Sequence, residues 1–195
     1  MIDVVSLSLG YYHEQPDDIT FDPFVLGPLH DLGILGVAVV AAAGNDSTDR
    51  PMFPAAFTPW DGGPVTAPDP GCVPVVSVGA RNPNRTIALF SNAGRWVACH
   101  RPGAGLVSTF PQTFNAAGQP SDAFLSPNEG IRSTIDPDDF LSGFGTWSGT
   151  SFAGPVLAGE IAAQLSLGDL LALDPAIAVP RGWDAVSACV PGLQR

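Results

Sequence analysis

Two apolar runs that end in glycine dominate the first 45 residues of the chain. Residues 3–10 (Asp-Val-Val-Ser-Leu-Ser-Leu-Gly) and 36–45 (Gly-Val-Ala-Val-Val-Ala-Ala-Ala-Gly-Asn) each have the pattern of a buried strand. Between them, Asp22 and the proline after it suit a helix start, and an apolar face predicts a helix to Leu32. Strand, helix and strand at this spacing imply a parallel sheet with right-handed crossovers. The sequence therefore predicts an α/β fold of three layers, with a mostly parallel sheet flanked by helices.

The rest of the chain continues this alternation within a single domain, residues 1–195. The same patterns predict strands at 73–78, 87–90 and 106–109, a helix from Ser151 to about Leu167, and short helices within 170–190. Residues 111–146 interrupt the alternation with an insertion rich in Gly, Pro, Ser, Asn and Asp. Long connections without periodicity are usually functional or flexible. This insertion is therefore either an edge of the substrate cleft or a surface excursion.

Composition narrows the classes of function. The chain has 195 residues, of which 45% are hydrophobic and 14% charged, enough apolar content for a sizeable core. The chain contains eight basic and nineteen acidic residues, which give it a net charge of -11. Such a charge argues against binding to nucleic acid or anionic membranes. The apolar run 33–44 is too short to span a bilayer, and no signal peptide follows Met1.

One serine stands in a context that suits a nucleophile. Residues 146–155 read Thr-Trp-Ser-Gly-Thr-Ser-Phe-Ala-Gly-Pro, so Ser151 directly follows Gly149 and Thr150 and opens an apolar helical run. Glycine permits close approach of a substrate, and a helix N-terminus directs free N–H groups and a positive dipole end at developing negative charge. Serine is also a common helix N-cap, and from Ser151 alone the two readings are equally good.

The order of three motifs decides between these readings. Ser-Leu-Gly at 8–10, Ala-Ala-Gly-Asn at 42–45 and Gly-Thr-Ser-Phe-Ala-Gly-Pro at 149–155 closely resemble the subtilisin-like serine peptidases. The resemblance extends to the connecting motifs Phe-Pro-Ala at 53–55 and Phe-Ser-Asn-Ala-Gly at 90–94. An α/β-hydrolase reading fails, because no histidine follows Ser151 and the pattern Gly-x-Ser-x-Gly is not met.

The resemblance implies roles for individual residues. Ser151 would be the nucleophile, and the Asn45 side chain with the Ser151 backbone N–H would form the oxyanion hole. The backbone of residues 8–10 would pair with an extended polypeptide substrate. Two segments would form the walls of the pocket for the residue before the scissile bond: Ser8, Leu9 and Gly10, and Ala42, Ala43 and Gly44.

The catalytic base and the carboxylate that orients it are not visible. In this family the order along the chain is Asp, His, Ser, and the Asp and His motifs lie upstream of the segment that matches residues 6–10. We therefore expect this chain to be the C-terminal, nucleophile-bearing part of a catalytic domain. His13, His30 and His100 lack a His-Gly-Thr context, so each is expected to be solvated or locally hydrogen-bonded, with His13 the one nearest the cleft.

Metal and redox chemistry stay open. Calcium is expected only from the resemblance, because Asp136, Asp138 and Asp139 have no recognisable site spacing and suit a solvated surface. The three cysteines allow one disulfide, such as a Cys72–Cys99 bridge, or three buried thiols. The resemblance implies an extracellular full-length enzyme.

Two functions follow. The first is a serine-type endopeptidase domain that acts through an acyl-enzyme on Ser151 and is incomplete in this chain. The alternative is a non-catalytic peptide-binding relative or an inactive gene fragment. The coding sequence upstream of Met1 discriminates them, because only the enzyme needs in-frame Asp and His motifs there.

Overall fold

The computed structural model describes residues 2–15, 19–113, 123–128, 130–133, 143–167 and 174–195. It divides into two compact units. The first contains Met1–Ala104 and Ser148–Arg195, and the second contains Gly105–Trp147.

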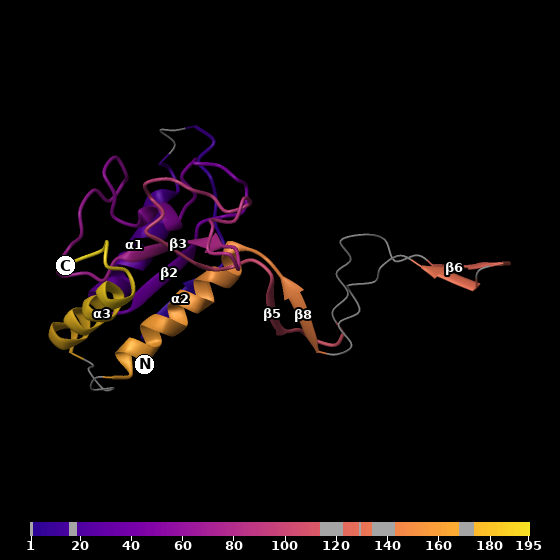
Figure 1. The fold of residues 1–195 in the computed structure, drawn as a ribbon. Helices are drawn as coiled ribbons and strands as arrows, with labels where there is room; N and C mark the ends of the chain where they lie inside the picture. The colour runs from indigo at the N-terminus through magenta and orange to yellow at the C-terminus, as the bar shows by residue number, and fades with distance from the viewer. Residues whose placement is uncertain (1, 16–18, 114–122, 129, 134–142, 168–173) are drawn as a thin grey trace. The chain divides into compact units, whose positions relative to one another are not determined.

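A parallel sheet forms the centre of the first unit (Figure 1). Its four strands lie in the order β1, β2, β3 and β4, and each pairs in parallel with its neighbour. Their bounds are Val4–Leu7, Ala38–Ala42, Val75–Arg81 and Cys99–Pro102. The register aligns Leu7 with Ala41, so β1 and β2 end at the same edge of the sheet.

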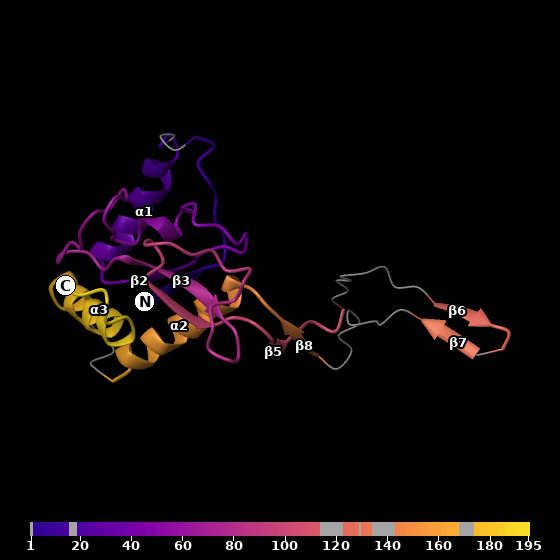
Figure 2. The same ribbon diagram turned by 45° about the horizontal axis from the view of Figure 1, so that its top comes forward.

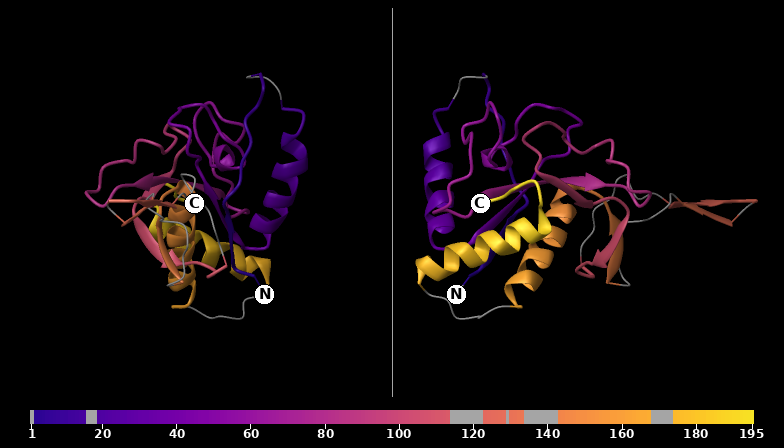
Figure 3. Two further views of the ribbon diagram at one scale, coloured as in Figure 1. Left: turned by 90° about the vertical axis from the view of Figure 1, so that its right-hand side faces the viewer. Right: turned by 60° about the vertical axis from the view of Figure 1, so that its left-hand side comes forward.

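Helices cover both faces of this sheet. Successive side chains of β2 point to opposite faces, and they belong in turn to two different hydrophobic cores. Val39 and Ala41 belong to the core under α1 (Asp22–Ile34). Ala38 and Val40 belong to the core under α2 (Thr150–Leu165) and α3 (Pro175–Cys189). Figures 2 and 3 show α1 apart from α2 and α3, with the strands between them. The predicted three-layer α/β fold is confirmed.

Four details of the prediction need correction. The N-cap of α1 is Phe21, and Asp22 is its first helical residue, with Phe24 of the supposed apolar face 76% exposed. Residues 87–90 form no strand; Ile87 makes one isolated bridge to Arg81. The strand β4 was not predicted. In the described part of the C-terminal region, residues 174–195, one helix, α3, takes the place of several short ones.

The second unit consists of antiparallel pairs. Strand β5 (Leu106–Thr109), which was predicted, pairs with β8 (Phe144–Trp147). Strands β6 (Ala123–Ser126) and β7 (Gly130–Ser133) pair with each other. None of the strands β6, β7 and β8 has an apolar pattern in the sequence that predicted it as a strand. All three lie in the predicted insertion or at its end.

Among the described residues, no helix is both long enough and apolar enough to cross a membrane.

The outer edge of β1 predicts association of the chain when it is studied alone. Within the described sheet β1 has a single neighbour, and a strand edge of this kind is a template for pairing with other chains. We expect the purified chain to be loosely folded or to aggregate. Calorimetry combined with light scattering measures this, and a sharp cooperative transition from a monomer would contradict it.

Candidate active site

The three motifs meet at the carboxyl edge of the sheet. Residues 8–10 leave β1 and residues 43–45 leave β2 at this edge, where open α/β sheets place their ligands. The N-terminus of α2 lies there as well, because Ser8 Oγ donates a hydrogen bond of 3.2 Å to the Ser151 carbonyl oxygen. Segments more than a hundred residues apart in sequence are thus brought together.

Hydrogen bonds fix the orientation of the Asn45 amide. Its Oδ1 accepts from the Thr150 backbone N–H at 2.8 Å and from Thr150 Oγ1 at 3.0 Å. Thr150 Oγ1, fully buried, in turn accepts from the Gly44 N–H at 3.0 Å. A backbone N–H can only donate, so the Asn45 oxygen must face Thr150. The Nδ2 group is thereby left as the donor of this amide, and the amide lies beside Thr150, the residue before Ser151.

Gly149 keeps the space beside this amide open. A Cβ built at Gly149 would lie 3.6 Å from Asn45 Nδ2 and 3.6 Å from a ring carbon of Phe152. A side chain at position 149 would extend from that point into the space between the amide and the helix. Glycine therefore leaves this space free of a side chain.

Asn92 supports the loop that carries Asn45, a role that the sequence motif did not reveal. It is fully buried, and its Nδ2 donates to the Ala43 carbonyl at 2.8 Å while its Oδ1 accepts from the Asp46 N–H at 2.9 Å. Its own N–H donates to the Gly44 carbonyl at 2.9 Å. One side chain thus holds both ends of the turn that follows β2.

Met52 is a second residue that sequence reasoning missed. A Cβ built at Gly10 would lie 2.5 Å from Met52 Cε, and one built at Gly44 would lie 2.7 Å from Met52 Sδ. The thioether therefore contacts both glycines of the two expected pocket walls, and Met52 is only 8% exposed. No local pattern in the sequence connects position 52 with positions 10 and 44, since the contact depends on the fold.

The histidines have other partners. His13 Nε2 lies 2.8 Å from Asp22 Oδ1, and its ring stacks on Phe53 at 4.1 Å. The Tyr11 hydroxyl donates to the same Asp22 oxygen at 2.9 Å, and burial is the largest cause of the raised pKa of Tyr11. Burial lowers the pKa of His100 on β4. None of the described hydrogen bonds joins a histidine to Ser151.

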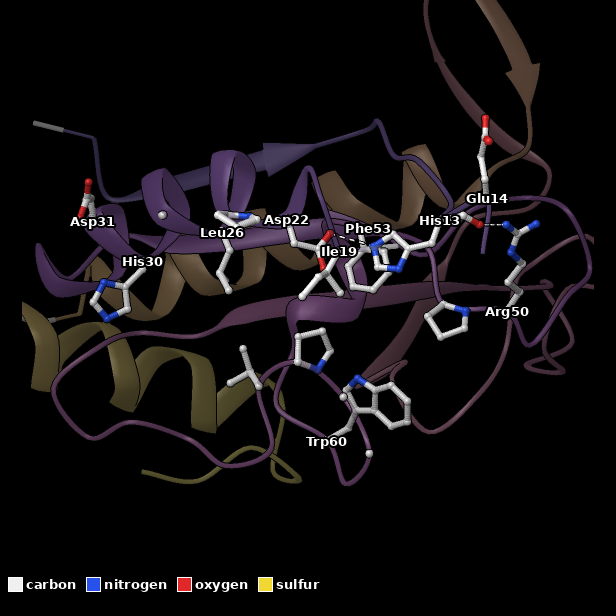
Figure 4. A pocket seen from close by; sticks show the side chains of 17 residues that line it. His13, Glu14, Ile19, Asp22, Leu26, His30, Asp31, Arg50, Phe53 and Trp60 are labelled. Atoms are coloured by element: carbon white, nitrogen blue, oxygen red, sulfur yellow. Dashed lines mark hydrogen bonds and ion pairs between the residues drawn. The ribbon is translucent and has the colours of Figure 1, made fainter. Parts of the chain in front are cut away.

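A large cavity lies between α1 and the segment 60–65 (Figure 4). Its volume is about 1240 Å³, and His13, Asp22, Phe53 and Trp60 are among its lining residues. Neither Asn45 nor Ser151 lines it. The cavity is therefore separate from the group of residues that the motifs identify.

The described residues contain neither a metal-binding cluster nor a disulfide bond. The described residues contain no group of three or more His, Cys, Asp or Glu side chains placed to hold a metal ion, and 136–139 lie outside the described residues. All three cysteines are free thiols. The structure does not bring Cys72 and Cys99 together, because Cys72 Sγ lies 3.6 Å from the His30 carbonyl oxygen of α1, whereas Cys99 packs against the core under α2 and α3.

The chain is similar to known proteins along most of its length. The model of the subtilase family, peptidase S8, matches residues 1–171. A subtilisin-like protease of Coccidioides posadasii is 32% identical over 143 residues, which are 73% of this chain and 25% of that protein. The minor extracellular protease Epr of Bacillus subtilis is 30% identical over 118 residues, which are 60% of this chain and 15% of that protein.

Solved structures show the same fold. A lanthipeptide protease superposes with a TM-score of 0.59 at 20% identity, covering 84% of this chain and 46% of that one. A cold-adapted subtilisin-like serine proteinase gives 0.53 at 24% identity, covering 91% and 45%. The chain thus spans a quarter or less of the curated relatives and just under half of these solved ones. Because the family match covers most of the chain, the protein belongs to the subtilase family and carries a serine peptidase domain of that family.

Proposed function

We propose that this chain supplies the nucleophile, the oxyanion-hole donors and part of the substrate cleft of a serine endopeptidase. The observation that carries the proposal is the pairing of Asn45 with Thr150. It orients an amide donor beside the N-terminus of the helix that begins with Thr150 and Ser151.

The chemistry follows from this arrangement. Ser151 Oγ attacks the carbonyl carbon of a peptide bond, a Ser151 O–C bond forms, and the carbonyl oxygen becomes an oxyanion. Asn45 Nδ2 and the Ser151 N–H donate to that oxygen, and the α2 dipole adds positive potential. The tetrahedral intermediate then expels the amine and leaves an acyl-enzyme, which water hydrolyses. These donors need no rearrangement during the reaction, because Thr150 already holds Asn45 in place.

Two proton transfers need a base that also acts as an acid. It takes the Ser151 hydroxyl proton during attack and gives a proton to the leaving amine. In this family the base is a histidine that an aspartate orients. We place both residues on a segment of the same domain upstream of Met1. His13 is unsuited to the role, because it lines the cavity beside α1, which Ser151 does not line, and no described hydrogen bond joins it to Ser151.

The substrate is a polypeptide. In our proposal the backbone of Ser8, Leu9 and Gly10 pairs with it as an added strand, and these residues face Ala42, Ala43 and Gly44 across the pocket for the side chain before the scissile bond. The Met52 thioether lies against a glycine of each wall. We therefore propose that this pocket favours small side chains.

Shortening Met52 tests this preference. In the completed domain, Met52→Ala should raise kcat/KM for substrates with Phe before the scissile bond, relative to Ala, by roughly tenfold or more, because the vacated volume admits the ring. Peptide pairs that differ only at that position measure the ratio. Leu89→Ala, at a side chain 90% exposed, is the control. An unchanged ratio would show that Met52 does not limit the pocket.

Fluorophosphonate labelling tests the proposal as a whole. Without a base the Ser151 hydroxyl is scarcely ionised at neutral pH, so the chain alone should not label, whereas the chain joined to its upstream Asp- and His-bearing segment should. Intact mass of both forms gives the result. Strong labelling of the lone chain would place a base among its own histidines. No labelling of the completed domain would favour the non-catalytic peptide-binding alternative.

The localisation is proposed from the name of a relative. A relative is named an extracellular protease, and the full-length protein is proposed to act outside the cytoplasm as well. Fractionation of the source cells with an antibody against this chain would test it, and a purely cytosolic signal would contradict it.

A further inference from the structure

The cavity beside α1 has the size and the walls of a site for a small molecule. Its volume of about 1240 Å³ exceeds the roughly 300–1,000 Å³ of typical ligand pockets. Leu26, Phe53 and Trp60 contribute apolar and aromatic surface to its lining. Figure 4 shows Asp22 and Leu26 on one side of the cavity and Trp60 on the other. A ligand between these walls would contact both α1 and the segment 60–65.

Asp22 brings a buried carboxylate to this lining. It is only 6% exposed, and its Oδ1 accepts from the Tyr11 hydroxyl at 2.9 Å and lies 2.8 Å from His13 Nε2. A carboxylate oxygen accepts, so His13 Nε2 carries the hydrogen, and Nδ1 of the neutral ring is then an acceptor. No described hydrogen bond engages Asp22 Oδ2 or His13 Nδ1. Two acceptors in the cavity lining are therefore available to a ligand.

The nearby donors are already engaged. Burial is the largest cause of the raised pKa of Tyr11, followed by its hydrogen bond to Asp22, so the phenol keeps its proton and donates it to that carboxylate. The Trp60 Nε1 group donates to the Ala56 carbonyl oxygen at 3.1 Å. A molecule that binds at Asp22 and His13 must therefore bring its own N–H or O–H donors.

The charges along the lining favour a cation. Acidic side chains outnumber permanently basic ones, with Glu14, Asp22 and Asp31 against Arg50. The Arg50 guanidinium is itself held, because it lies 5.0 Å from the centroid of the Tyr12 ring and donates to the His13 carbonyl oxygen. The remaining titratable groups of the lining, His13 and His30, are charged only when protonated.

We propose that this cavity binds a small organic cation with an aromatic body, whose charged group donates to Asp22 and His13 and whose ring lies against Trp60. Aromatic faces such as those of Trp60 and Phe53 also attract cations. The inference does not depend on peptidase activity, because neither Asn45 nor Ser151 lines the cavity. Benzamidine is the simplest probe, since its planar amidinium offers several N–H donors next to a ring.

Equilibrium dialysis against three ligands of similar shape tests the chemistry. We expect saturable binding of one benzamidine per chain, and binding of uncharged benzamide that is at least tenfold weaker. Benzoate should not bind, because its carboxylate has no donor and is repelled by Asp22. The dialysis is run on the chain alone and on the completed domain, so that association of the lone chain does not hide the result. Benzamide that binds as tightly as benzamidine would overturn the proposal.

Asp22→Asn tests where the cation binds. The amide keeps an oxygen for Tyr11 and His13 but loses the charge, so benzamidine binding should weaken roughly ten- to hundredfold. Asp46→Asn is the matched control, because Asp46 Oδ2 also accepts from a tyrosine hydroxyl, that of Tyr12 at 2.6 Å, but Asp46 does not line the cavity. Its affinity for benzamidine should be unchanged. Equal affinity in Asp22→Asn would overturn the proposal.

Gly27→Leu tests the cavity itself. Gly27 of α1 lines the cavity, and a Cβ built there has no heavy atom within 4 Å, so leucine fits the helix and its side chain fills the space for the ligand. Gly159→Leu on α2 is the control, since Gly159 has the same open surroundings away from the cavity. Circular dichroism checks the fold of both variants. Benzamidine should bind Gly159→Leu normally and Gly27→Leu at least tenfold more weakly, and equal binding to both would place it elsewhere and refute the inference.

Discussion

Replacing Ser151 by alanine in the completed domain should lower kcat by about six orders of magnitude, the size of effect known when the nucleophile of subtilisin is removed. The Ser151 oxygen forms the covalent bond in the proposed mechanism, so no other group takes over the step. Substrate binding should persist, because the backbone of residues 8–10 is untouched. Burst kinetics with an activated ester, together with peptide cleavage, measure the loss.

Ser166→Ala is the matched control. It makes the same substitution just beyond the other end of α2, where Ser166 is exposed and its hydroxyl donates to the Ala163 carbonyl. Its kcat should equal that of the unmodified domain. Activity retained in Ser151→Ala would move the nucleophile elsewhere and leave Ser151 as an ordinary residue of the helix start.

The second large effect concerns Asn45. Asn45→Ala should lower kcat by about two to three orders of magnitude with little change in KM, a magnitude carried over from subtilisin for the loss of one oxyanion-hole donor. The donor acts on charge that develops only in the transition state, so ground-state binding is spared. Steady-state kinetics on a peptide substrate separate the two parameters.

Asn45→Asp separates donation from local structure. The carboxylate still offers an oxygen to the Thr150 N–H and hydroxyl, which now bind Asn45 Oδ1 at 2.8 and 3.0 Å, but it cannot donate to an oxyanion and repels it. Its kcat should fall at least as far as that of the alanine variant. Asn84→Ala, in an exposed turn, is the control. If Asn45→Asp is fully active, Asn45 serves only the turn.

The two central strands, β2 and β3, could be predicted from sequence because they are buried on both faces. β2 is buried at all five positions, and a continuous apolar run of that length has few alternatives. β1 and α1 followed from the same logic, since glycine marks where each apolar segment stops. Their parallel arrangement needed only the rule for right-handed crossovers.

The errors arose where backbone pairing and apolar pattern disagree. Residues 87–90 look like a strand, but the chain turns at Arg85, where φ is 69°, and Ser91 donates to the Ala88 carbonyl, so only one bridge to β3 forms. β4 reads Cys-His-Arg-Pro, which has no strand pattern. It pairs with β3 through its backbone. The Arg101 guanidinium donates hydrogen bonds to Glu160 of α2 and to the Cys189 carbonyl oxygen of α3.

At the candidate site, the sequence motifs pointed to particular residues, but the contacts that hold those residues in place could not be predicted. Asn45 and Ser151 belong to motifs, and the structure brings Asn45 to the residue before Ser151. The buried contacts of Asn92 and the packing of Met52 on two glycines depend on segments that are distant in sequence. Such contacts exist only once the fold has formed, so no periodicity records them.

The bond between the Gly149 N–H and the Gly103 carbonyl oxygen, 2.7 Å long, joins the two points where the main unit gives way to residues 105–147. The backbone therefore leaves and re-enters the first unit through residues that already touch. Excising the intervening stretch and closing the gap with a short turn would ask nothing of the sheet or of α2. The second unit is therefore expected to be exchangeable for another sequence without moving Ser151.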